Sequence, residues 1–331
     1  MSASDPNLRI AILGAGALGQ RWAETLASLP GVSLAGFVDP IFDEDRRPEW
    51  LRAYSGIPAA SSLTELPNQR IDAALVAAFS PAHAEAVQTA LDHDLHVFVE
   101  KPFTVDLASA DSLVRTASER KRIIMVNQNY RFFPGPRLVS ELWQKRAYGD
   151  IRSAVCQFWC NWPGKPYQHR MEHPMGLEMA VHHFDLARFM FAAEPVSGLA
   201  VEWNPAQSPY QSAGALEATF ILRNAAGEFP FNYSGSLVSS TAQVPWAGYW
   251  RFEFDRGTIF ADESLGGYYL WLSRGGKRTR LSEFGDSTMG FTASFTHFLE
   301  CIQTGEQPSS SGQDNLNTLR MALSFLSPSK R

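Results

Sequence analysis

A short glycine pattern near the start of the chain limits its fold more than any other feature. Residues 9–13 form an apolar run, and Gly14, Gly16 and Gly19 follow it at the start of a helical stretch over residues 18–29. In this setting the first glycine permits a tight turn. The second lets backbone amides approach a pyrophosphate, and the third lets helix and strand pack closely. We therefore predict a strand, a turn and a helix that bind a dinucleotide.

The cofactor is predicted from the residues around this turn. Ala17 and Leu18 would lie in the first turn of the helix, where unpaired amides and a partial positive charge favour a phosphate. Asp39 ends the next apolar run, ~20 residues downstream, where a carboxylate accepts a hydrogen bond from a ribose 2′-hydroxyl. Because a carboxylate repels a 2′-phosphate, we predict NAD. NADP stays an alternative, since Arg46 and Arg47 follow.

Two later turns are predicted to reach the same site. Ser80 and His83 follow the apolar run over residues 71–78, and Glu100 and Lys101 follow the run over residues 96–99. Ligands of open α/β sheets bind at the carboxyl ends of the strands. We predict that all four residues contact the cofactor, with helix capping by Ser80 and packing by His83 as the alternatives. Lys101 is also predicted to act on a second ligand.

The first part of the chain alternates strands with helices. Apolar runs over residues 9–13, 32–38, 71–78, 96–99 and 123–127 alternate with helical stretches over residues 18–29, 82–92 and 107–120. This rhythm is typical of right-handed βαβ units in a parallel, doubly wound sheet. It predicts an α/β Rossmann domain over residues 1–128.

The rhythm changes after residue 136. Strand-like segments follow at residues 151–162, 214–222, 227–237, 249–254, 258–261 and 268–273, with helices predicted at residues 137–146, 176–192, 292–303 and 313–326. Gly- and Asn-containing turns between the strands indicate hairpins. The sequence thus predicts a second, α+β domain over residues 129–331, built on a large, mostly antiparallel open sheet.

The bulk composition excludes several classes of protein. The 331 residues suit two domains, and the net charge of −5 argues against nucleic acid or an anionic membrane as a partner. No apolar run approaches the ~20 residues of a membrane span. Met1 to Arg9 lack a signal peptide, and the three cysteines fit buried thiols in a reducing compartment, so we expect a cytoplasmic protein.

The chemical site is predicted on the apolar helix over residues 176–192. Glu178, His182 and Asp185 fall at i, i+4 and i+7, on one face of this helix. Ionisable groups on a mostly buried helix must be paired or face a cleft. His183 points about 100° away and is the poorer candidate. A solvent-exposed stripe or a satisfied core histidine is the structural alternative.

These residues suit the oxidation of a secondary alcohol. We predict that His182 accepts the hydroxyl proton, that Lys101 stabilises the developing alkoxide and that a carboxylate orients one of the partners. His169, Arg170 and His173 precede the helix in a polar loop that could reach a polyhydroxylated substrate. The histidines show no metal-like spacing, so no metal is predicted.

The order of these motifs resembles a known family. A glycine fingerprint, then Glu100-Lys101-Pro102, then an acid-x-x-x-His-x-x-Asp helix is similar to the glucose–fructose oxidoreductase, inositol dehydrogenase and rhizopine-catabolism (Gfo/Idh/MocA) family. The resemblance covers nearly the whole chain. It implies NAD(P)-linked redox chemistry on sugars or polyols, with Lys101 and His182 as catalytic residues.

The resemblance also assigns further residues and shows two departures. Glu178 stands where members of the family commonly carry a catalytic aspartate, and Ala180 where they carry glycine. Asp185 corresponds to the later helix acid. Asn129-Tyr130-Arg131 resembles a segment near the substrate, so Arg131 and Arg170 are predicted to bind substrate, together with Lys101, Glu178 and His182. A structural role for Arg131 is the alternative.

Three functions remain open from sequence alone. The first is a dehydrogenase or reductase of a sugar or cyclic polyol. The second is a redox-neutral sugar-processing enzyme that recycles a tightly bound NAD, and the third is a non-enzymatic regulator that senses the cofactor. Aromatic side chains crowd residues 246–254 and 268–271, which favours a homodimer or homotetramer formed through the second sheet over packing inside one chain.

Overall fold

The computed structural model of the chain describes residues 7–42, 46–67, 70–240, 243–285 and 287–326. The chain divides into two compact units, Met1–Asn127 with Phe291–Leu316 and Gln128–Gly290 with Asn317–Arg331. The predicted division into a cofactor domain over residues 1–128 and a substrate domain over residues 129–331 concerns function, and it stays a prediction. Within the described ranges, no helix is both long enough and apolar enough to cross a bilayer.

The first unit contains the predicted parallel sheet. Its strands are β1 (Leu8–Leu13), β2 (Val32–Val38), β3 (Ala59–Ala60), β4 (Ala73–Val76), β5 (His96–Val99) and β6 (Ile124–Val126). All pairs are parallel, in the order β3-β2-β1-β4-β5-β6, which is the Rossmann order. The helices are α1 (Ala17–Ala27), α2 (His83–Asp92) and α3 (Leu107–Glu119), with 3₁₀ turns η1 (Glu49–Tyr54), η2 (Leu63–Glu65) and η3 (Ser80–Ala82).

The strand register brings the predicted cofactor residues to one edge. The last residues of five strands form a single row across the sheet: Val38, Leu13, Val76, Val99 and Val126. The residue after each strand therefore lies at the same carboxyl edge, and these residues are Asp39, Gly14, Ala77, Glu100 and Asn127. The turn that carries Lys101 thus starts at the same edge as the glycine turn, with the end of β4 between them.

The core of this unit includes residues from near the end of the chain. Trp22 of α1 packs on Phe291 and Phe295 of helix α7 (Ser287–Thr304), with ring centroids 4.8 and 5.7 Å apart. Phe98 of β5 contacts Phe295 and Phe298 at 5.0 and 5.5 Å. The predicted helix over residues 292–303 is present, but its place in the first unit was not predicted.

The second unit is built on the predicted large sheet. Its strands are β7 (Ile151–Trp159), β8 (Glu194–Trp203), β9 (Ala215–Asn224), β10 (Gly227–Ser236), β11 (Tyr249–Phe254), β12 (Gly257–Ser264), β13 (Gly267–Arg274) and β14 (Lys277–Glu283). They run in the order β14-β13-β12-β11-β7-β10-β9-β8, and every neighbouring pair except β7 and β10 is antiparallel.

Strands β8 and β14 were not predicted. Pro195 and Gly198 interrupt the apolar pattern of β8, and Lys277, Arg278 and Arg280 make β14 read as a polar loop. Both strands lie at the ends of the sheet, where a proline, a glycine or charged residues are tolerated because one side of the strand has no neighbour.

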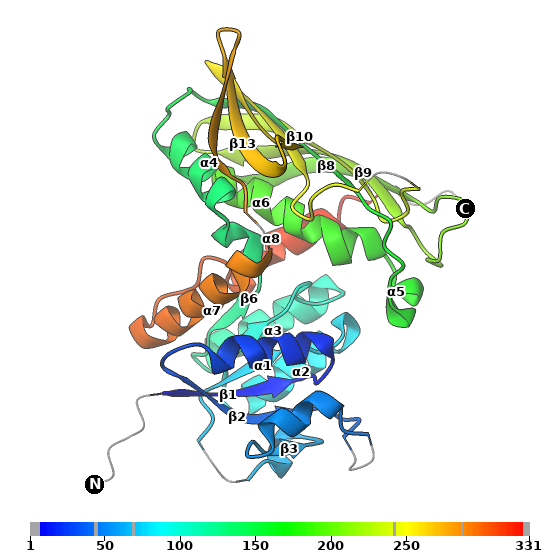
Figure 1. Ribbon diagram of the computed structural model, residues 1–331, viewed down its shortest axis with the longest axis vertical. Coiled ribbons are helices and arrows are strands. Elements are labelled where there is room, and N and C mark those ends of the chain that lie inside the picture. The colour runs from blue at the N-terminus through cyan, green and yellow to red at the C-terminus, as the bar shows by residue number, and fades with distance from the viewer. Residues whose placement is uncertain (1–6, 43–45, 68–69, 241–242, 286, 327–331) are drawn as a thin grey trace. The chain divides into compact units, whose positions relative to one another are not determined.

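Helices pack on one face of this sheet, as Figure 1 shows for α4 and α6. The helical elements are η4 (Asn129–Phe132), α4 (Pro134–Gln144), α5 (Pro166–Arg170), η5 (Gly176–Ala180), α6 (Val181–Phe191) and α8 (Gly312–Leu323). Phe184 of α6 contacts Phe220 and Tyr233 of the sheet, with centroids 5.1 and 5.0 Å apart. All residues of α6 are buried except the partly exposed Phe189.

The predicted helix over residues 176–192 is present, but it contains a π-helical turn. Gly176–Ala180 forms a π-helical turn, and the α-helix begins only at Val181. A π-helical turn holds an extra residue, so Glu178 does not share the simple i, i+4 face with His182 that an α-helix would give. Such turns occur often at functional sites.

The aromatic side chains of β11 and β13 divide between the two faces of the sheet. Trp250, Phe252 and Phe254 are at most 6% exposed and fill the core, because alternate residues of β11 point to the buried face of the sheet. Trp271 lies on the opposite face from the buried Leu270, and the guanidinium of Arg278 covers its ring at 4.1 Å. The exposed apolar residues of this sheet lie instead on β8, where Val196, Leu199, Val201 and Trp203 are between 42% and 56% exposed.

Candidate active site

Of the three glycines in the turn, only Gly16 has room for a Cβ atom. Gly14 has φ +102°, and a Cβ atom there would lie 2.5 Å from the Ala78 nitrogen; a Cβ on Gly19 would lie 2.0 Å from the Gly14 oxygen. The protein itself therefore requires these two glycines. A Cβ on Gly16, in contrast, would meet nothing within 4 Å. The protein leaves open space beside Gly16, and this space fits the close approach of a ligand such as a pyrophosphate.

The start of helix α1 fits the same ligand. Gly16 is the N-cap residue and makes no side-chain capping bond, and the first turn contains no acidic residue. The amides of Ala17 and Leu18 lie in this turn, where an α-helix supplies no carbonyl partner. The partial positive charge of the helix end adds to the attraction for an anion.

Asp39 connects the end of β2 to the glycine turn. Its Oδ2 atom accepts a hydrogen bond from the Ala15 amide at 2.9 Å, and its Oδ1 atom accepts one from the Ile41 amide at 3.2 Å. The indole of Trp50 donates to the Ala15 carbonyl at 3.3 Å. Asp39 is only partly buried, so its carboxylate stays within reach of a ligand at this edge.

Glu100 is a buried junction within the first unit. Its Oε1 atom accepts hydrogen bonds from the Trp22 indole and from the Asn127 amide, both at 2.8 Å, and its side chain is 3% exposed. Its Oε2 atom accepts from the Lys101 amide at 3.3 Å. Glu100 therefore anchors the backbone of Lys101; contact of Glu100 with the cofactor stays a prediction.

Ser80 and His83 are both buried near this edge. Ser80 begins η3 and is 4% exposed. The Nδ1 atom of His83 lies 2.6 Å from the Pro102 carbonyl oxygen, and its Nε2 atom lies 3.1 Å from that of Ala78. His83 thus connects the turn after β4 to the turn that follows Lys101. This geometry favours the packing role over direct cofactor contact.

Lys101 is partly exposed at the carboxyl edge of the parallel sheet, and its peptide bond to Pro102 is cis. It belongs to the first unit, whereas Glu178 and His182 belong to the second. Their meeting in one catalytic site is a proposal, which we argue below.

His182 lies near the start of α6 and is stacked on an aromatic ring. The imidazole is parallel to the phenol ring of Tyr130, with centroids 4.2 Å apart and an interplanar angle of 13°. His182 and Tyr130 are each 6% exposed. Burial raises the pKa of Tyr130, so its hydroxyl stays protonated near neutral pH.

Glu178 lies on the π-helical turn and is partly exposed. Burial, followed by the nearby Cys160 and then by the charge of Glu178, raises the pKa of Tyr210. The Tyr210 hydroxyl donates to the Trp162 carbonyl at 3.0 Å.

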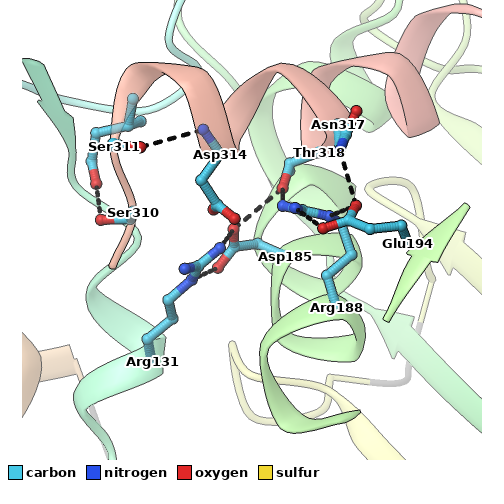
Figure 2. Close-up of polar contacts among 10 residues, drawn as sticks. Arg131, Asp185, Arg188, Glu194, Ser310, Ser311, Asp314, Asn317 and Thr318 are labelled. Carbon is cyan, nitrogen blue, oxygen red and sulfur yellow. Dashed lines mark hydrogen bonds and ion pairs between the residues drawn. The ribbon is translucent and has the colours of Figure 1, made fainter. Parts of the chain in front are cut away.

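Arg131 and Asp185 form a buried ion pair. The Nε and Nη2 atoms of Arg131 donate to the two carboxylate oxygens of Asp185, each at 2.6 Å, and the two side chains are 4% and 1% exposed. Figure 2 shows how Thr318 of α8 continues the network: it donates to Asp185 at 3.1 Å and accepts from Arg188 at 2.8 Å. Arg188 is paired in turn with Glu194. This geometry favours the structural alternative for Arg131.

His183 is a satisfied core histidine. Its Nε2 atom lies 3.0 Å from the Trp246 carbonyl oxygen, and its Nδ1 atom lies 3.0 Å from the Tyr233 hydroxyl. Burial lowers the pKa of His183 to about 4, so the ring is neutral at neutral pH. The Nε2 atom then donates to the carbonyl, and the Nδ1 atom accepts from Tyr233. His183 is therefore not available as a proton acceptor for a substrate.

The polar segment before η5, which was predicted as a loop, contains the short helix α5 and is held by its own contacts. The Nε2 atom of His169 lies 2.6 Å from the Pro163 carbonyl oxygen. The Nδ1 atom of His173 lies 2.6 Å from Glu202, and this hydrogen bond raises the pKa of His173. Arg170 is exposed at the end of α5, where its guanidinium can meet a ligand.

No metal centre or disulfide is formed by the part of the chain that the structure describes. No group of three or more His, Cys, Asp or Glu residues in it is arranged to hold a metal ion. Cys156, Cys160 and Cys301 are buried thiols, as predicted, and burial raises the pKa of each, that of Cys160 to about 12.

Comparison with known proteins agrees with this geometry. The family model described as "Oxidoreductase family, NAD-binding Rossmann fold" (GFO_IDH_MocA) matches residues 8–128, the region that contains the glycine turn and Lys101. The myo-inositol 2-dehydrogenase of Thermotoga maritima is 25% identical over 322 residues, which cover 93% of this chain and 92% of the relative. Residues 8–128 therefore match the Rossmann domain of the Gfo/Idh/MocA oxidoreductase family, and the similarity to the inositol dehydrogenase extends over nearly the whole chain.

Other similar proteins agree with this match. The scyllo-inositol 2-dehydrogenase (NAD(+)) of Bacillus subtilis is 25% identical over 320 residues, which cover 91% of this chain and 88% of the relative. The structure of an oxidoreductase from Agrobacterium radiobacter in complex with NAD+, L-tartaric acid and magnesium has a TM-score of 0.83. It is 19% identical and covers 96% of this chain and 94% of its own, which confirms the fold. This chain is therefore an oxidoreductase with an NAD-binding Rossmann fold.

Sequence reasoning missed two residues that the structure places beside predicted ones. Trp22 binds Glu100, and Tyr130 stacks on His182. Tyr130 could have been predicted, because it adjoins Arg131 in the segment expected near the substrate. Nothing in the spacing of Trp22 indicated a partner 78 residues away.

Proposed function

We propose that this protein transfers a hydride between a nicotinamide cofactor and the secondary alcohol or ketone of a sugar or cyclic polyol. The observation that carries the proposal is the alignment of the glycine turn with the turn of Lys101 at one edge of the parallel sheet. A lysine beside a dinucleotide site supports chemistry on a second ligand. Two relatives are named as dehydrogenases of inositols, which are cyclic polyols.

The cofactor residues proposed are those of the glycine turn and of the neighbouring strand ends. Gly14, Gly16, Ala17 and Leu18 would hold the pyrophosphate, and Asp39 would accept from the adenosine ribose. The open space at Gly16 and the helix end without a side-chain cap support the first part. The partly exposed carboxylate of Asp39 supports NAD over NADP, because it would repel a 2′-phosphate.

The chain's own residues would handle the proton. When bound, the nicotinamide supplies the acceptor or donor of the hydride. His182 takes the hydroxyl proton of the substrate, and Lys101 stabilises the negative charge that develops on the oxygen. Glu178 accepts a hydrogen bond from a neighbouring hydroxyl, and Arg170 binds the outer part of the substrate. This assignment requires the two units to bring Lys101 and His182 to one substrate.

The first test is a panel of sugars, inositols and sugar lactones with NAD and with NADP, followed by the absorbance of the reduced nicotinamide. Oxidation of a polyol with NAD, lost in a His182→Ala variant, is the expected result. An exposed histidine offers the matched control: His93→Ala, on the surface at the end of α2, should keep full activity.

Each negative result points to a different function. If no compound of the panel reacts and NAD is still present in the purified protein, the result would favour the redox-neutral sugar-processing enzyme. Cofactor binding without turnover of any sugar, unchanged by replacement of Lys101 and His182, would favour a regulator. Absence of cofactor binding would contradict the proposed site altogether.

We further propose that the protein is a cytoplasmic homo-oligomer joined through the open face of the second sheet. Leu199, Val201 and Trp203 form an apolar stripe along β8, with 43–56% of each side chain exposed in the single chain. A contiguous apolar stripe on an open sheet favours contact with a second copy. Light scattering should give a dimer or tetramer, and Leu199→Asp should shift it towards the monomer.

A further inference from the structure

The stack of Tyr130 on His182 is a contact that the proposed chemistry does not yet use. The two rings are nearly parallel, with an interplanar angle of 13° and a centroid distance of 4.2 Å. Both side chains lie in the second unit, and both are buried. An imidazole held face to face with a phenol cannot turn its plane freely, because rotation would drive its edge into the other ring.

Tyr130 is itself held by a second aromatic ring and by its neighbour in the chain. The ring of Phe133 lies 4.8 Å from that of Tyr130, at an angle of 31°. The next residue after Tyr130 is Arg131, whose guanidinium is fixed by Asp185 in two hydrogen bonds. Asp185 lies three residues after His182 on the same helix, α6. The ion pair therefore ties the short helix η4 to the helix that carries His182.

A second layer fixes Asp185. Thr318 of α8 donates to its Oδ1 atom at 3.1 Å and is fully buried, and Arg188, one turn later on α6, donates to Thr318. Buried charges in such a network must keep their partners, because an unpaired buried charge costs several kcal/mol. Figure 2 shows the arrangement that satisfies these charges.

We propose that Tyr130 is a positioning residue for His182, and that the Arg131–Asp185 pair keeps Tyr130 in place. The phenol ring sets the plane of the imidazole, so that its ring nitrogens point in a fixed direction when a substrate hydroxyl arrives. This proposal rests on the proposed function, in which His182 accepts the proton. It explains why Arg131 is buried beside the predicted site instead of reaching a ligand.

The role belongs to the ring and not to the hydroxyl. Burial keeps the phenol protonated, so Tyr130 contributes no charge and no base near neutral pH. A phenylalanine supplies the same flat face, whereas a leucine fills much of the volume without a face to stack on. Tyr130→Phe and Tyr130→Leu therefore form a matched pair that separates stacking from bulk packing.

The direct measurement is NMR of histidine rings labelled with ¹³C and ¹⁵N. The chain has eight histidines, and the His182 signals are assigned by their loss in His182→Gln. A face-to-face aromatic ring moves the ring-proton resonances of His182 upfield. This shift should persist in Tyr130→Phe and disappear in Tyr130→Leu, with the seven other histidine signals unchanged as the control for folding.

Kinetics on a substrate found with the panel provides the second measurement. Tyr130→Leu should lower kcat about tenfold or more with little change in KM, because orientation in the reacting state is lost while binding remains. Tyr130→Phe should keep kcat within about twofold of the parent. A rise in KM with an unchanged kcat would contradict a role in positioning.

The outcomes of the two measurements separate the proposals. An unchanged His182 spectrum in Tyr130→Leu, or a lost shift with unchanged kcat, would overturn the positioning role. If no sugar is turned over, the proposed function fails, and the NMR result still decides whether Tyr130 orients His182. If Tyr130→Leu does not fold, Tyr130→Met takes its place, and a retained upfield shift there would overturn the proposal.

Discussion

Both carboxylate oxygens of Asp185 accept a hydrogen bond from the guanidinium of Arg131, at 2.6 Å each, in a place where neither side chain is more than 4% exposed. Two parallel bonds between a planar cation and a planar anion fix both groups in direction as well as in distance. Because water does not reach the pair, each charge depends on the other for its solvation.

Removal of one charge from this pair should destabilise the protein strongly. We expect Asp185→Asn to lower the free energy of unfolding by about 3–5 kcal/mol, because the buried guanidinium of Arg131 loses its counter-charge. The double variant Arg131→Met with Asp185→Leu should lose less of the free energy of unfolding, because it leaves no unpaired buried charge. Urea unfolding measures both. Asp92→Asn, which breaks an exposed pair with Arg120, should cost about 1 kcal/mol or less, and an equal cost at both sites would contradict the argument.

The two glycines of the cofactor turn should respond differently to alanine. Gly14→Ala places a Cβ atom 2.5 Å from the Ala78 nitrogen at a positive φ, so it should destabilise the fold by about 2 kcal/mol or more. Gly16→Ala meets no protein atom within 4 Å and should leave the thermal midpoint nearly unchanged. It should weaken NAD binding about tenfold or more in calorimetry. Unaltered NAD affinity would remove Gly16 from the site.

Asp39→Asn isolates the charge of the proposed ribose ligand. The amide oxygen of asparagine can still accept from the Ala15 amide, so the glycine turn should be kept. Loss of the negative charge should weaken NAD about tenfold and improve NADP, because a 2′-phosphate is no longer repelled. Dissociation constants of both cofactors are the measurement. A constant ratio between them would show that Asp39 does not choose the cofactor.

Lys101→Ala should abolish most of the turnover and spare the cofactor. The backbone of Lys101 is held by Glu100, so removal of its side chain should not disturb the turn. We expect kcat to fall by ~10²–10⁴-fold, the usual contribution of a group that handles a proton or its charge. NAD affinity should change little. Lys277→Ala, on the exposed strand β14, is the control and should be fully active.

His183 should make stability depend on pH in acid. Its pKa is about 4 in the folded chain and 6.5 when unperturbed, so between these values the unfolded chain binds the extra proton. Its contribution is complete above pH 6.5 and is lost as the pH falls towards 4, with a slope of up to about 1.4 kcal/mol per pH unit. Urea unfolding of the wild type and His183→Gln at several pH values measures the difference. Parallel curves would show that His183 does not cause the loss.

The parallel sheet was predictable because its signals are local. Each strand is a short apolar run followed by a turn, and β2 and β5 begin and end at the predicted residues. Strands β8 and β14 were missed because an edge strand needs no continuous apolar pattern. The π-helical turn at Gly176–Ala180 was also missed, since its residues have an ordinary helical composition.

The candidate site was predictable in its residue types but not in its pairings. The position of Lys101 follows from strand order, and that of His182 from a charged face on an apolar helix. The partner of Asp185, in contrast, is an arginine 54 residues away, and no spacing indicates a contact at that distance. For the same reason, Arg131 was predicted to bind substrate, whereas its guanidinium is engaged by Asp185.

The aromatic contacts of α7 affect when the first unit can fold during synthesis. Phe291, Phe295 and Phe298 close the core around Trp22 and Phe98, yet the ribosome adds them only after more than 160 further residues have followed Asn127. A nascent chain that ends near residue 128 would therefore expose Trp22 and Phe98 to water. The first unit to be translated is also one that cannot finish folding until the final helices emerge.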